Sequence, residues 1–220
     1  LIFMAIGPQL KWIKAGLAKK LHLLVLFIIS LSISFFLVKN LEINFLINTV
    51  LIGSAFYLFI ITIRDFILKK FKNIEQNLAH FGFSLLILSI LFNNIFSSEL
   101  ITNLKVGESF KNNRFEIIFN DLKKFEKKNY ISFKGNFSIK ENKLVEELEP
   151  ELRIYNQPNI ITSEADIKTT LFTDKFITIN TVQNQEYFNV RYQVKPFMLW
   201  IWISVLLISL GGLISLFKKK

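Results

Sequence analysis

The sequence has 220 residues, 51% of them hydrophobic, and its mean hydropathy is +0.40. This composition excludes an ordinary soluble domain as the starting expectation. The absence of cysteine excludes a disulfide framework, a thiolate metal site and a cysteine nucleophile within this chain. The formal net charge is +10, and the distribution of that charge decides between nucleic acid and lipid as the anionic partner.

The chain begins within a hydrophobic run. The opening "LIFMAIGP" starts at Leu1 and has neither the charged first region nor the small-residue cleavage site of a signal peptide. We therefore expect it to be the tail of a membrane helix, and the chain to be a fragment of a longer protein.

Four further stretches are long and apolar enough to cross a bilayer, which takes about 20 mostly apolar residues. They are approximately residues 21–38, 43–63, 78–96 and 197–217. Three of the four have no polar stripe to face water, so buried helices of a soluble protein are a poor explanation. The fold class predicted is an α-helical integral membrane protein with four to five transmembrane helices in this chain.

Basic residues in short connections predict the orientation. Three short segments carry the basic excess, against Lys39 alone in residues 39–42. These residues are Lys11, Lys14, Lys19 and Lys20; Arg64, Lys69, Lys70 and Lys72; and Lys218, Lys219 and Lys220. The positive-inside rule puts these segments in the cytoplasm and residues 97–196 outside. Because residues 97–196 hold 15 basic and 14 acidic residues, the net charge indicates membrane lipid and no nucleic acid as partner.

Residues 97–196 show the two-residue period of β-strands. "YISFKGNFSI" places Phe133, Phe137 and Ile139 on one side with Gly135 between them, where a bulge or bend is expected. The same pattern predicts further strands at residues 115–119, 151–155, 175–180 and 187–194. The prediction is one inserted, mainly antiparallel β domain, either a barrel or a sandwich.

No catalytic constellation is visible in this domain. It has no histidine, cysteine or Gly-rich phosphate loop, and its acidic pair, Glu164 and Asp166, is explained more simply as solvated charge beside a strand. The chain thus divides into a transmembrane region (1–96), a β domain (97–196), and a last helix with a basic tail (197–220).

The two histidines lie near the predicted cytoplasmic ends of two spans. His22 follows "AKK" at the water boundary, where an interfacial role is sufficient. Counted from a helix start at Ile74 or Glu75, His80 lies one to two turns into the third span, with Phe83, Ser84 and Ile87 on its face. Neutral imidazole in an apolar cavity suits a haem iron, although a hydrogen bond to a neighbouring helix explains it as well. Gly82 points elsewhere around the helix, which favours close helix packing.

Several phrases together resemble the C-terminal part of the CcmF family of bacterial cytochrome c maturation. The phrases are "GPQLKW" (7–12), "NLAHFGF" (77–83), "LEPELRIYNQ" with "TSEADI" (148–167) and "VRYQVKPFMLWIWISVLLISLGG" (190–212). Their order along the chain agrees with the predicted spans, and the similarity covers nearly all 220 residues.

The resemblance implies part of a haem lyase in the bacterial inner membrane, with the β domain periplasmic and the C-terminus cytoplasmic. His80 takes the position of a family histidine that is an axial ligand of a membrane-embedded haem b. The second ligand and two external haem-holding histidines are expected upstream of Leu1. The implied partners are a CcmH-type thiol protein, CcmI where present, the haem carrier CcmE and apocytochrome c, whose CxxCH thiols receive the haem.

Two alternatives remain open. One is a membrane scaffold without enzymatic activity, in which the β domain binds a partner. The other is a plain b-type electron-transfer subunit in which His22 and His80 together ligate the iron.

Overall fold

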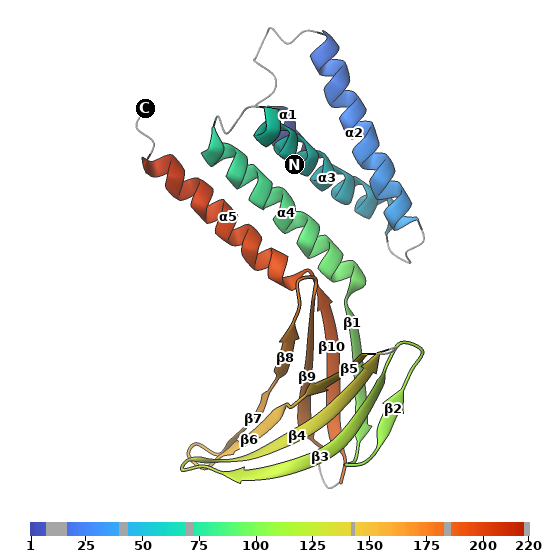
Figure 1. The fold of residues 1–220 in the computed structure, drawn as a ribbon, viewed down its shortest axis with the longest axis vertical. Helices are drawn as coiled ribbons and strands as arrows, with labels where there is room; N and C mark the ends of the chain where they lie inside the picture. The colour runs from blue at the N-terminus through green and yellow to red at the C-terminus, as the bar shows by residue number, and fades with distance from the viewer. Residues whose placement is uncertain (8–16, 40–43, 69–72, 142–143, 183–185, 218–220) are drawn as a thin grey trace. The chain divides into compact units, whose positions relative to one another are not determined.

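A computed structural model describes residues 1–7, 17–39, 44–68, 73–141, 144–182 and 186–217. They form two compact units, one of helices from residues 1–95 and 197–220, and one of strands from residues 96–196. Figure 1 shows both units along the chain.

The helical unit contains five helices among the described residues. They are α1 (Ile2–Ile6), α2 (Leu17–Val38), α3 (Phe45–Leu68), α4 (Ile74–Phe96) and α5 (Met198–Phe217). All but α1 are long and apolar enough to cross a membrane. The predicted membrane fold is therefore confirmed. Helix α3 continues about one turn past its predicted end at residue 63, and α4 begins at Ile74, one of the two helix starts that the sequence suggested.

Helices α2 and α3 pack closely through small and hydroxylated residues. The hydroxyl of Ser34 donates to the carbonyl oxygen of Thr49 at 2.8 Å, a hydrogen bond from one helix to the other. A β-carbon at Gly53 would lie 2.7 Å from the side chain of Leu31, so glycine permits the close approach. Such contacts replace the hydrophobic driving force that lipid does not supply between membrane helices.

Helix α4 is packed on two sides. Phe56 contacts Phe92 and Phe59 stacks on Phe81, so α3 and α4 run antiparallel. On the α5 side, a β-carbon at Gly82 would lie 2.9 Å from the carbonyl oxygen of Ser204. The prediction that Gly82 serves helix packing is confirmed by this contact.

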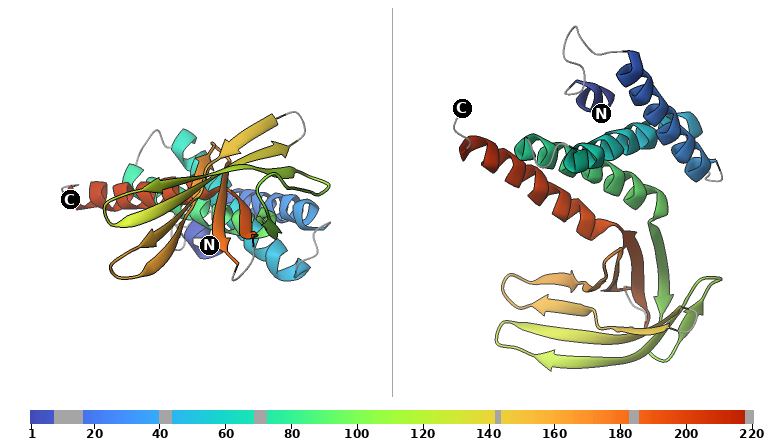
Figure 2. Two further views of the ribbon diagram at one scale, coloured as in Figure 1. Left: turned by 90° about the horizontal axis from the view of Figure 1, so that it is seen from below. Right: turned by 45° about the horizontal axis from the view of Figure 1, so that its top comes forward.

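The second unit is a two-sheet β-sandwich (Figure 2). One sheet has the order β1-β10-β9-β8, and the other β2-β3-β4-β6-β7, with β5 paired to the far end of β4. All the pairs are antiparallel. The strands are β1 (Ser98–Leu104), β2 (Ser109–Lys111), β3 (Glu116–Glu126), β4 (Tyr130–Glu141), β5 (Leu144–Leu148), β6 (Glu151–Tyr155), β7 (Ile160–Glu164), β8 (Asp166–Thr169), β9 (Thr173–Thr181) and β10 (Phe188–Pro196).

Alternating side chains from both sheets form the sandwich core, as the two-residue period predicted. At its centre Phe119 stacks on Phe137 with ring centroids 4.3 Å apart. A bulge or bend was expected at Gly135 of β4. The irregularity instead lies on the neighbouring strand β3, where the pairing register with β4 shifts between Phe119 and Asp121. Gly135 is buried beside it, and a β-carbon there would lie 2.7 Å from the ring of Phe137.

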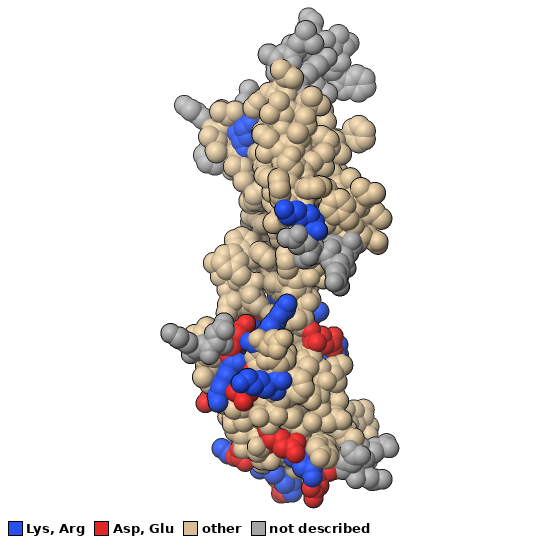
Figure 3. Space-filling model, turned by 90° about the vertical axis from the view of Figure 1, so that its right-hand side faces the viewer, with Lys and Arg blue, Asp and Glu red and all other residues tan. Residues whose placement is uncertain are grey.

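Charged side chains are distributed unequally over the two units. Figure 3 shows mixed Lys, Arg, Asp and Glu over the β unit and very few over the helices on the visible face. This difference agrees with spans that face lipid and a domain that faces water.

Candidate functional site

His80 lies in the second turn of α4. It is six residues from the first residue of the helix, which corresponds to about 9 Å along the axis. Its side chain is partly buried. On the same face, Ser84 is fully buried and donates to the carbonyl oxygen of Phe81, while Phe83 packs against the core cluster that contains Tyr57. The imidazole therefore has an apolar, packed environment within a membrane helix.

The last turn of α3 brings two charged residues to the same region. The Nη2 of Arg64 donates to the Oδ1 of Asp65 at 3.1 Å, and their side chains are 19% and 7% exposed. Phe66, next to Asp65, contacts Phe81, next to His80, so this turn of α3 lies beside the turn of α4 that carries His80. The Nε of Arg64 is buried and has no hydrogen-bond acceptor within the described part of the chain. Three ionisable side chains thus lie together in an otherwise apolar helical unit.

Arg64 and Asp65 are the residues that sequence reasoning missed. Arg64 was interpreted as a topology residue in a cytoplasmic loop, and Asp65 received no role. The structure instead places both inside α3, and the pair is largely buried. A usable signal was present, because an adjacent acid and base that follow a long apolar run are costly in a membrane and so suggest a function.

Aromatic rings fix the helices that carry this cluster. Phe81, next to His80, stacks on Phe59 with centroids 5.1 Å apart and meets Phe66 edge-on at 6.2 Å. Since α3 and α4 touch at these rings, Asp65 and His80 are carried by two helices in direct contact.

His22 lies in α2 and its side chain is exposed. The neighbouring Leu23 is instead buried in the cluster that α2 shares with α3. Exposure agrees with an interfacial role for His22. The structure of the described residues does not test the pairing of His22 with His80, which stays a prediction.

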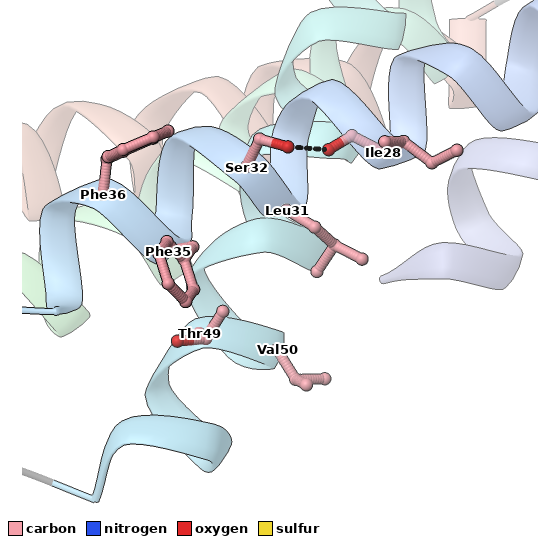
Figure 4. Close-up of a pocket in the computed structure, with 7 residues that line it drawn as sticks. All are labelled: Ile28, Leu31, Ser32, Phe35, Phe36, Thr49 and Val50. Carbon is pink, nitrogen blue, oxygen red and sulfur yellow. Dashed lines mark hydrogen bonds between the residues drawn. The ribbon is translucent and has the colours of Figure 1, made fainter.

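A groove of about 400 Å³ lies between α2 and α3, in the half of α3 that is far from Arg64 and Asp65 (Figure 4). Its lining is mostly apolar, and the hydroxyl of Ser32 donates to the carbonyl oxygen of Ile28 in its own helix at 2.9 Å. The hydroxyl of Thr49 likewise donates to the carbonyl oxygen of Phe45 in its own helix at 2.7 Å, so the groove presents a mostly apolar surface. Its lining residues are Ile28, Leu31, Ser32, Phe35, Phe36, Thr49 and Val50.

The acidic pair of the β unit has structural partners. Asp166 accepts a hydrogen bond from the backbone N–H of Glu149 at 2.6 Å, where the chain passes between the two sheets. Glu164 lies 3.8 Å from Arg153 and accepts from the hydroxyl of Thr162. Within the described residues there is no group of three His, Cys, Asp or Glu that could hold a metal. These contacts agree with the reading of the pair as charge beside strands.

One buried ionic cluster does occur in the β unit. The Nζ of Lys175 donates to Glu141 at 2.7 Å and to Glu146 at 3.0 Å, and the lysine side chain is 13% exposed. Desolvation opposes the charge of Lys175, but the bonds to both carboxylates outweigh it and raise its pKa. Burial also raises the pKa of the nearby Tyr192 to about 12. The cluster joins the two sheets and has the character of a structural tie.

Several predicted topology residues lie outside the described residues. They are Lys11, Lys14, Lys69, Lys70, Lys72 and Lys218, Lys219 and Lys220, and the side chains of Lys19 and Lys20. Most of the phrase at residues 7–12 also lies there.

The sequence of this chain is similar to those of known proteins. Residues 95–196 match the family described as the CcmF C-terminal beta-sandwich. Over the whole chain, the sequence is 26% identical to the cytochrome c-type biogenesis protein CcmF of Escherichia coli strain K12, and it covers 35% of that protein. It is 30% identical to the CcmF of Pseudomonas fluorescens over 146 residues, which are 66% of this chain and 22% of the relative. The chain thus spans about a third or less of these relatives.

The fold has a counterpart among solved structures. The structure titled cytochrome c heme lyase CcmF matches 99% of this chain with a TM-score of 0.72 and 19% identity, and 38% of that protein is covered. Helices and sandwich are therefore matched together. Residues 95–196 thus match the family of the CcmF C-terminal beta-sandwich, and the whole chain is similar to part of proteins named CcmF.

Proposed function

We propose that the chain is part of a cytochrome c haem lyase and supplies one axial ligand, His80, to a membrane-embedded haem b. Its relatives are named for cytochrome c biogenesis, and the matching structure is titled a heme lyase. The observation that carries the proposal is the partly buried imidazole of His80 on a membrane-spanning helix, with the largely buried pair of Arg64 and Asp65 on the neighbouring helix.

The described residues suit a haem. Neutral imidazole offers one nitrogen lone pair to iron, and metal-bound histidine commonly gives its other N–H to a carboxylate, as Asp65 would receive it. Phe83 and the cluster around Tyr57 supply apolar surface beside His80. When bound, haem b supplies one-electron chemistry, which would keep the iron of the substrate haem reduced during ligation.

The work of this chain is then to hold and orient. α4 places the imidazole at a fixed depth, and α5 fixes α4 through the close contact at Gly82. The joining step forms a bond between a CxxCH thiol sulfur of apocytochrome c and a vinyl carbon of haem, and the proton goes to the other vinyl carbon. No thiol is required from this chain, in agreement with its lack of cysteine.

Topology and partners follow the same proposal. The similarity to bacterial CcmF proteins favours the bacterial inner membrane, and the positive-inside rule favours a periplasmic β-sandwich and a cytoplasmic C-terminus. The sandwich would then face apocytochrome c, a CcmH-type thiol protein with CcmI where present, and the haem carrier CcmE.

A spectrum of the full-length protein in gently solubilised membranes tests the proposal. We expect a reduced b-type absorption spectrum that His80→Ala weakens strongly and His22→Ala leaves unchanged. Loss of the spectrum with His22→Ala would favour the electron-transfer alternative. An unchanged spectrum with His80→Ala, or a protein without haem, would overturn the proposal and favour the scaffold.

A further inference from the structure

We infer that Arg64 and Asp65 form the polar side of the haem site: Asp65 positions His80, and Arg64 binds an anionic carboxylate of the haem. The inference rests on the proposed function and extends it from one ligand to three residues of two helices. Neither residue is explained by the predicted orientation alone, because both side chains are largely buried.

The position of the pair is the first argument. Arg64 and Asp65 lie four and three residues before the end of α3, and His80 lies six residues after the start of α4. At 1.5 Å per residue, these offsets differ by only about 3–5 Å along the axes of two antiparallel helices. The contact of Phe66 with Phe81 confirms that these turns lie beside each other. The three ionisable groups are therefore at similar depth.

The charge of Asp65 is the second argument. Its side chain is 7% exposed, its carboxylate accepts from Arg64, and it lies on the turn of α3 that faces the turn of α4 with His80. A carboxylate that accepts the N–H of one imidazole nitrogen leaves the lone pair of the other nitrogen for iron and fixes the ring orientation. Asp65 is thus a positioning residue.

The unused donor of Arg64 is the third argument. Guanidinium presents five N–H donors in a fork that matches a carboxylate. Its Nη2 donates to Asp65, and its buried Nε has no acceptor in the described part of the chain. An unmade hydrogen bond of a buried charged group is costly, which favours a ligand that accepts it. Haem carries two propionate carboxylates on an otherwise apolar ring.

An anchoring role at the membrane surface would look different. A snorkelling arginine keeps its charged head in water while its stem lies along apolar surface. The side chain of Arg64 is instead 19% exposed, and its Nε is among the buried atoms.

The redox potential of the full-length haem protein provides the first test. Asp65→Asn removes a negative charge beside the axial histidine, so it should raise the midpoint potential of the haem. Removing the positive charge should lower it, so Arg64→Gln shifts it in the opposite direction. Lys39→Gln, a charge at the far end of α2, is the control and leaves the potential unchanged. Both site variants should also bind haem about 10–100-fold more weakly, the usual effect of losing an outer-shell partner.

A modified cofactor provides the second test, specific to Arg64. Full-length protein made without haem is reconstituted with haem or with haem dimethyl ester, which has no anionic carboxylates. The natural protein should prefer the free acid about tenfold or more, and Arg64→Gln should lose that preference. Arg64→Lys keeps the charge without the fork and should retain part of it.

The outcomes separate the inference from the proposed function. Loss of haem in His80→Ala, together with unchanged potential, affinity and acid preference in both site variants, would overturn the inference and leave the proposed function standing. If His80→Ala keeps its haem, the proposed function fails first. Should Asp65→Asn fail to fold, the ester comparison with Arg64→Lys still decides the role of Arg64.

Discussion

Two neighbouring glycines of α5 test how closely α4 and α5 are packed. A β-carbon at Gly211 would lie 2.8 Å from the backbone nitrogen of Ala79 and 2.8 Å from the carbonyl oxygen of Glu75, whereas one at Gly212 meets nothing within 4 Å. Replacing either glycine by alanine gains about 1 kcal/mol of helix propensity. Only Gly211→Ala also overpacks the interface, at a cost of about 1–3 kcal/mol, because backbone atoms cannot rotate away.

The difference between the two variants isolates the packing effect, since both share the propensity gain. We expect Gly211→Ala to be less stable than Gly212→Ala by about 1–3 kcal/mol, or roughly five- to 150-fold in the unfolding equilibrium. Reversible unfolding of the chain in mixed micelles, followed by helical circular dichroism, measures it. Equal stability of the two variants would refute the packing of α4 on α5, and with it the account of how His80 is held.

The β unit supports three more predictions, each measured by unfolding of the chain in detergent. Because folding raises the pKa of Tyr192 to about 12, the contribution of Tyr192 to the free energy of unfolding is complete below pH 10 and is lost towards pH 12. Tyr192→Phe should flatten this loss of stability with pH, and an unchanged slope would contradict the prediction. Lys175→Met leaves the carboxylates of Glu141 and Glu146 without their shared lysine and should lower the free energy of unfolding by about 2 kcal/mol or more. Lys124→Met, in an exposed ion pair, should lower it by less than about 1 kcal/mol. Gly135→Ala should cost about 1–3 kcal/mol because its β-carbon meets the ring of Phe137, and a neutral effect would show that the ring can move aside.

The sequence predicted what depends on periodicity and length. The spans are visible because the bilayer demands about 20 apolar residues, and β4 is visible because Phe133, Phe137 and Ile139 alternate towards the core. The strands β1, β2, β5, β7 and β8 were missed, and all but β1 have only three to five residues, which seldom show a clear period. The sandwich was not separable from a barrel because the pairing of distant strands is a tertiary property.

The candidate site was only half predictable for a related reason. His80 stands out because it is a lone ionisable group in an apolar run. Arg64 looks like one more basic residue of a cytoplasmic loop until α3 is seen to continue to Leu68. Helix ends are poorly marked in membrane proteins, where the run of apolar residues stops before the helix does.

The geometry of a helical hairpin explains why the three polar residues belong together. In two antiparallel helices joined by a short connection, residues at similar distances from the connection lie at similar depth in the membrane. Asp65 and His80 satisfy this condition across residues 69–73, and Arg64 is bonded to Asp65. A buried carboxylate alone would strain the apolar unit, and so would a buried guanidinium; together they are neutral and still leave one donor of Arg64 and the imidazole available. A ligand that is apolar in its body, anionic at its edge and able to bind imidazole satisfies all three residues at once, and haem is such a ligand.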